Sequence, residues 1–64
     1  MTIEKAIRLL DPYTTQEEIN KIRRDNVSLS EQETYNIVID EIEEACKLAC
    51  EIMRDYLERK GDVE

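Results

Sequence analysis

The chain has 64 residues, of which 39% are charged, and a net charge of −7 at pH 7, with no His, Trp or Phe. A chain this short can form a single domain, but it buries little surface and gains much from a disulfide, a metal or a partner subunit. Because His is the commonest general base and a common metal ligand, its absence argues against an enzyme.

The negative charge is concentrated in the second half of the chain. Residues 31–44 contain six carboxylates and no Lys or Arg. Such a surface repels phosphate backbones, so we expect no direct binding to nucleic acid. No stretch approaches the roughly 18 apolar residues of a membrane span, and the N-terminus has no signal-peptide pattern. We therefore expect a cytoplasmic protein with reduced cysteines and no membrane contact.

The first predicted helix covers residues 3–10. Thr2 is suited to cap its N-terminus, and Pro12 ends it because the residue before a proline avoids the helical conformation. Its expected apolar stripe consists of Ile3, Ala6, Ile7 and Leu10.

The second predicted helix covers residues 16–25. Thr14 with Glu17, and Thr15 with Glu18, each have the spacing of a capping box. A third possibility is that Asp11 caps a helix with Pro12 at its first position.

The third predicted helix covers residues 31–60, a stretch without Gly or Pro. Ser28 with Glu31 and Ser30 with Glu33 are alternative capping pairs, and Gly61 marks the end. About 30 residues form a rod near 45 Å long, which two short helices cannot cover. We therefore expect two short helices packed on one long C-terminal amphipathic helix, in a single all-α domain over residues 1–64 that assembles as a homo-oligomer.

Two apolar stripes run along this long helix. The first, which we call the first seam, has alternating steps of three and four residues and is our candidate oligomer interface: Tyr35, Val38, Ile42, Ala45, Ala49, Ile52 and Tyr56. The neighbouring stripe contains Ile39, Cys46, Cys50, Met53 and Leu57. We expect one stripe to face the chain's own helices and the other a second copy, and the pattern leaves open which stripe does which.

The two cysteines have the spacing of only half a structural metal site, which needs four ligands. Cys46 and Cys50 lie among apolar residues, so we interpret them as small core residues. We expect neither a metal nor a cofactor.

The basic residues form the candidate ligand site. Lys21, Arg23 and Arg24 lie in the second predicted helix, and Arg8, together with Lys5, in the first. One interpretation is pairing with the acidic residues 31–44 of another subunit. The alternative is an anion site, in which guanidinium groups clasp a phosphate and Tyr13 stacks on a base. No catalytic residue is proposed.

The opening Met1–Ile7 and the following Leu10-Asp11-Pro12 resemble a group of very small, uncharacterised helical proteins encoded by phages and prophages of Gram-positive bacteria. Glu44-Ala45-Cys46 and Ala49-Cys50-Glu51 are similar to their closing helix. The resemblance implies a context in which small accessory proteins block host defences, by binding a host protein or by sequestering a nucleotide signal.

These observations favour a non-catalytic binding protein. The leading hypothesis is a counter-defence protein that sequesters a small anionic, nucleotide-type ligand between subunits in the host cytosol. The alternatives are an acidic inhibitor of a basic host protein, and a structural or regulatory phage accessory protein.

Overall fold

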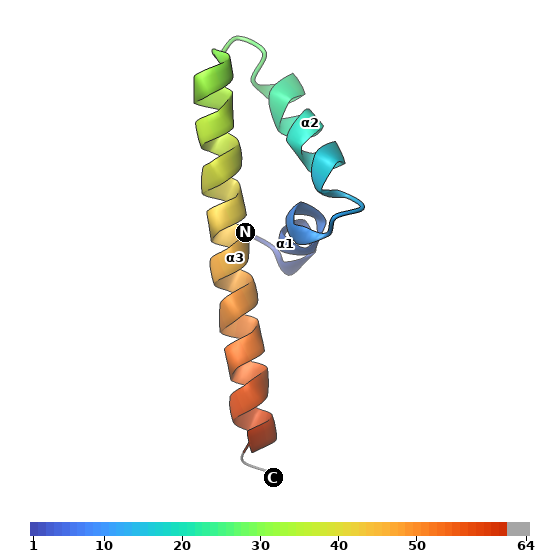
Figure 1. Cartoon of the computed structure of the whole chain (residues 1–64), viewed down its shortest axis with the longest axis vertical. Helices are drawn as coiled ribbons and strands as arrows, with labels where there is room; N and C mark the ends of the chain where they lie inside the picture. Colours follow the sequence, from blue (N-terminus) through green and yellow to red (C-terminus); the bar gives the residue numbers. More distant parts are fainter. Residues whose placement is uncertain (62–64) are drawn as a thin grey trace.

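The computed structural model describes residues 1–61, and within them the chain forms three helices. These are α1 (Ile3–Leu10), α2 (Thr15–Asp25) and α3 (Glu31–Gly61). Each bound lies within one residue of the sequence expectation. The chain is elongated, 52 × 19 × 16 Å. Figure 1 shows α3 as a straight rod with α1 and α2 on one side, beside its N-terminal half and middle.

α1 is capped as predicted. The Thr2 hydroxyl oxygen accepts a hydrogen bond from the backbone N–H of Lys5 (3.1 Å), which satisfies a free donor of the first turn. At the other end the backbone N–H of Asp11 still donates to the Ile7 carbonyl (2.8 Å). Asp11 itself is extended, as expected for the residue before Pro12.

None of the three predicted starts of α2 forms as expected: the helix begins at Thr15, Pro12 lies in the turn before it, and neither capping box forms. The Asp11 carboxylate accepts from the backbone N–H of Tyr13 (2.9 Å), and its carbonyl accepts from that of Thr15 (2.9 Å). The Thr14 hydroxyl instead donates to the Arg8 carbonyl (2.7 Å), and no side-chain bond caps the helix at Thr14. The corner between α1 and α2 is therefore fixed by the end of α1.

α3 starts at the second of the two predicted capping pairs. The Ser30 hydroxyl oxygen accepts from the backbone N–H of Glu33 (3.2 Å) and donates to the Glu33 carboxylate (3.1 Å). Ser30 is therefore the cap, and α3 begins at Glu31.

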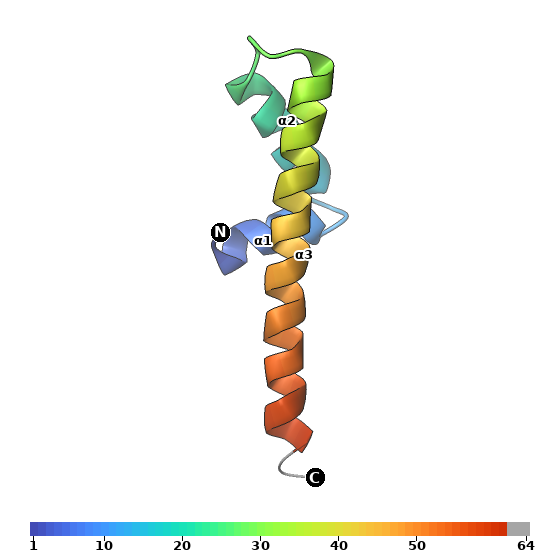
Figure 2. The same cartoon turned by 90° about the vertical axis from the view of Figure 1, so that its left-hand side faces the viewer.

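The core lies where α1 crosses the middle of α3, and Figure 2 shows the two helices running crosswise. Ala6 and Leu9 of α1 pack with Ala45 of α3, and Leu48 lies against this cluster. Leu9 is 2% exposed and Ala45 is fully buried. Two alanines at the crossing allow the backbones to approach closely.

Only one of the four residues in the predicted apolar stripe of α1 is buried within the chain. Ala6 is buried, but Ile3, Ile7 and Leu10 are exposed, and the missed residue Leu9 takes their place. Ala6 and Leu9 are three residues apart and share a face of the helix. Because α1 crosses α3 and touches it over only one turn, these two residues are enough to form the contact.

α2 covers the N-terminal half of α3 with little apolar surface. Ile22 of α2 and Val38 of α3 are buried, as are the polar Glu18 and Thr34. The Thr34 hydroxyl donates to the Ser30 carbonyl (3.0 Å), so its burial leaves no free donor.

The first seam is divided by this packing. Its central members Val38 and Ala45 are buried against the chain's own helices, whereas Tyr35, Ile52 and Tyr56 are exposed. The structure therefore assigns the middle of our candidate interface to contacts inside the chain, because α1 and α2 lie on that face.

The interpretation of the cysteines as core residues is wrong for this chain by itself. Cys46 and Cys50 are free and exposed, because α1 lies against the other stripe of α3. Farther along, every residue from 51 to 60 is exposed, including Met53 (57%) and Leu57 (65%).

Candidate functional site

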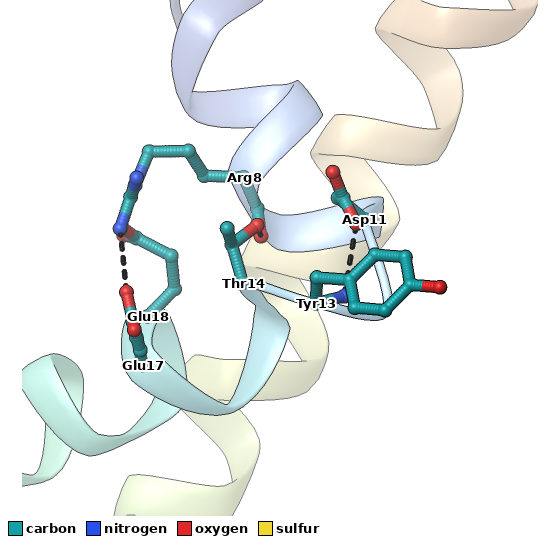
Figure 3. A network of polar contacts seen from close by, with 6 residues as sticks. All are labelled: Arg8, Asp11, Tyr13, Thr14, Glu17 and Glu18. Atoms are coloured by element: carbon teal, nitrogen blue, oxygen red, sulfur yellow. Dashed lines mark hydrogen bonds and ion pairs between the residues drawn. The ribbon is translucent and has the colours of Figure 1, made fainter.

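Arg8, expected to bind an external anion, forms ion pairs with α2. Its Nε donates to the Glu18 carboxylate and its Nη2 donates to Glu17 (3.1 Å), as Figure 3 shows for the side chains at this corner. The hydrogen bond from Arg8 holds the pKa of Glu18 below its ordinary value. The same bond to Glu18 raises the pKa of Arg8. Arg8 therefore stabilises the corner between α1 and α2.

Lys5 is also used inside the chain. Its Nζ lies 3.2 Å from a carboxylate oxygen of Glu41 on α3. The sequence suggested pairing between the basic residues and residues 31–44 of another subunit, and this contact joins the same two groups within one chain.

The remaining basic residues lie in two places. Lys21 and Arg24 line an open hollow of about 490 Å³ beside Arg8, together with Glu17 and Glu18. Arg23 lines a different hollow, between α2 and the start of α3, with Val27 and Tyr35 among its neighbours. Successive residues of a helix point about 100° apart, which separates Arg23 from Arg24.

Tyr13 lies at the corner and is 91% exposed. In Figure 3 its ring and the guanidinium group of Arg8 point away from each other. Of the predicted ligand-binding residues, the structure therefore brings together Lys21, Arg24 and Arg8, the last already paired. It does not bring Arg23 or Tyr13 to them.

The acidic residues of α3 form a second candidate surface. Asp40, Glu43 and Glu44 are exposed, and they form no ion pair within the described part of the chain. They lie on the side of α3 that faces away from Ala45 and hence from α1. Of the acidic residues of α3, Glu41 pairs with Lys5; it lies about one turn before Glu44, on the side of α3 that faces α1.

The third candidate surface is apolar. An open groove beside α1 is lined by the three exposed residues of its predicted stripe and by α3: Ile3, Ile7, Leu10, Leu48, Ala49 and Ile52. Ile3, Ile7 and Leu10 belong to the apolar stripe that the sequence predicts for the first helix. The same spacing predicts an apolar face correctly, but it does not specify whether the chain itself covers that face.

Residues 1–61 contain no cluster of three or more potential metal ligands. None of the helices in this range combines the length and the apolar character that crossing a bilayer requires. Comparison of the chain with family models, curated proteins and solved structures finds no significant match.

Proposed function

We propose that this chain is a non-catalytic binding protein whose outer acidic surface on α3 engages a basic surface of another protein. We define this outer acidic surface as Asp40, Glu43 and Glu44. The observation that carries the proposal is that these three are exposed and form no ion pair within residues 1–61, while the cations Lys5 and Arg8 are engaged within the chain.

Electrostatics explains why such a surface favours a basic partner. Like charges on consecutive helical turns repel one another, and a cationic partner relieves that repulsion. Complementary charge also speeds association and rejects anionic partners such as nucleic acid. In the phage context suggested by the sequence resemblance, the partner is a basic protein of the host defence.

Charge reversal tests this proposal. A chain carrying Asp40→Lys and Glu44→Lys is expected to lose partners that wild type captures from host lysate. The matched control carries Glu51→Lys and Glu58→Lys, which change the net charge by the same amount at exposed positions nearer the C-terminus. Equal capture by wild type and both variants would contradict the proposal.

Anion binding is a second candidate, favoured by the hollow that Lys21 and Arg24 line. A nucleotide phosphate bound there competes with Glu17 and Glu18 for these cations, so the site is weaker than the sequence suggested. Under this candidate, cyclic nucleotides raise the melting temperature of wild type but not of a Lys21→Ala/Arg24→Ala variant. A Lys47→Ala/Arg54→Ala chain is the control, and an unchanged melting temperature of wild type removes the candidate.

Self-association through α3 is part of the proposal. The chain exposes 5343 Å², whereas a compact protein of this mass exposes about 4,300 Å². The difference is about 1,000 Å², close to the roughly 800 Å² that each partner contributes to a standard interface. A second copy on α3 would cover this excess surface.

A further inference from the structure

We propose that two copies of the chain pair through α3 in antiparallel orientation, with Cys46 of each copy at the two-fold axis. The inference rests on the self-association proposed above and adds the residues and the direction of the contact. It does not depend on the acidic-surface proposal.

The contact surface is a set of residues that we call the outer seam. Its members recur at alternating steps of four and three residues: Tyr35, Ile39, Ile42, Cys46, Ala49, Met53 and Tyr56. This is the spacing of a helix that pairs with another helix over its whole length. Unlike the first seam, the outer seam has no member that the chain's own helices bury: Ile42 and Ala49 are half-buried and the rest are exposed.

The outer seam replaces three members of the first seam by their neighbours. Ile39, Cys46 and Met53 stand where the first seam had Val38, Ala45 and Ile52. Each replacement moves its own position about 100° around the helix, away from α1 and α2; because the other four members are shared, the surface as a whole turns by roughly 40°. The outer seam therefore meets the face that α1 and α2 cover only along its edge, where Ile42 and Ala49 are half-buried.

Charge favours the antiparallel direction. The first half of α3, residues 31–44, has six carboxylates and no basic residue. Residues 45–61 have four basic and three acidic residues. A parallel pair places the two acidic halves side by side, whereas an antiparallel pair places each acidic half beside the half with a slight positive charge.

Length and side-chain size define the register. Residue 46 is the midpoint of Glu31–Gly61, so an axis there gives full overlap of the two helices. In this register Ile39 lies opposite Met53 of the second copy, and Ile42 lies opposite the small residues Ala49 and Cys50. The antiparallel pair places small side chains opposite each other only at the Cys46 axis, whereas a parallel pair would also stack Ala49 on Ala49 and leave voids in two successive layers.

Disulfide cross-linking tests the orientation. The background is a full-length chain with Cys46→Ala and Cys50→Ala, into which Ile39→Cys or Met53→Cys is introduced. When the two chains are mixed and oxidised, the expected main product joins position 39 to position 53. Each chain oxidised alone gives only traces, because in an antiparallel pair the two copies of residue 39 lie about 21 Å apart along the helix. A mixture of Asp40→Cys and Glu51→Cys chains, both on the outward face, is the control and stays uncross-linked.

The outcomes separate the two claims. Efficient cross-linking of position 39 to itself, in a chain with the mass of a dimer, overturns the antiparallel orientation and leaves self-association standing. Absence of every cross-link, with the mass of a monomer, overturns both claims.

Discussion

Arg8 of α1 and Glu18 of α2 form an ion pair across the corner that joins their helices. Glu18 is 8% exposed, so its charge is compensated where water has little access. This pair turns a residue that the sequence suggested for ligand binding into part of the fold. The pair also explains how the corner between α1 and α2 keeps its shape although little apolar surface is buried there.

The Arg8–Glu18 pair predicts how stability depends on pH. The pKa of Glu18 is lower in the folded chain than its ordinary value of 4.5. The pairing therefore stabilises the fold above pH 4.5, and this contribution is lost as the pH falls through the lowered folded value. Glu18→Gln is expected to lower the melting temperature at pH 7 and to flatten its decline in acid. Glu17→Gln, which changes a more exposed carboxylate, is the control, and an equal effect of both variants would refute the assignment.

The position of the core predicts that the adjacent residues Leu9 and Leu10 contribute unequally to the free energy of unfolding. Leu9→Ala leaves a cavity under α1 and is expected to cost about 2–5 kcal/mol of unfolding free energy. Leu10→Ala removes a side chain that is 39% exposed and should cost much less. Urea unfolding at one fixed protein concentration measures both values. Equal losses would mean that α1 is rotated on α3.

The hydrogen bonds at the start of α2 predict that Asp11 contributes more to stability than Thr15. Asp11→Ala removes the carboxylate that accepts from the Tyr13 N–H and is expected to cost about 1 kcal/mol. Thr15→Ala leaves that contact intact and should change stability by less than about 0.5 kcal/mol. If Thr15→Ala were the more damaging variant, the predicted Thr15–Glu18 capping box would be the correct assignment.

The helices were predictable from the sequence because their ends carry local signals. Thr2, Pro12 and Ser30 act through neighbours within four residues, so spacing along the chain is enough to find them. At α2 the same signals overlapped, and three starts were equally compatible with the residues. The bond of Thr14 to the Arg8 carbonyl and the pairing of Glu18 with Arg8 are contacts between helices, which no local pattern specifies.

The candidate site was less predictable because it depends on how the helices cross. The sequence contains two apolar stripes on α3 but does not determine which one α1 selects. That choice buries Ala45 and exposes Cys46. Likewise, five basic residues on the first two helices suggested one patch, and helix geometry with three ion pairs divided it.

The outer seam predicts how a single charge affects assembly. Met53→Lys places an ammonium group against Ile39 of the second copy and is expected to give monomers. Met53 is 57% exposed in the single chain, so the helical circular dichroism of the monomer should survive. Glu51→Lys adds a lysine on the outward face and should leave the mass and the concentration dependence of the melting temperature unchanged. A similar mass for wild type and both variants would contradict the seam.

The central claim is that a second copy covers the exposed apolar face of α3. Sedimentation equilibrium of the unmodified chain under reducing conditions, over a range of micromolar concentrations, tests this claim most directly. We expect twice the 7.6 kDa mass of the chain at the upper end of the range, with dissociation on dilution. A mass of 7.6 kDa at every concentration would contradict it.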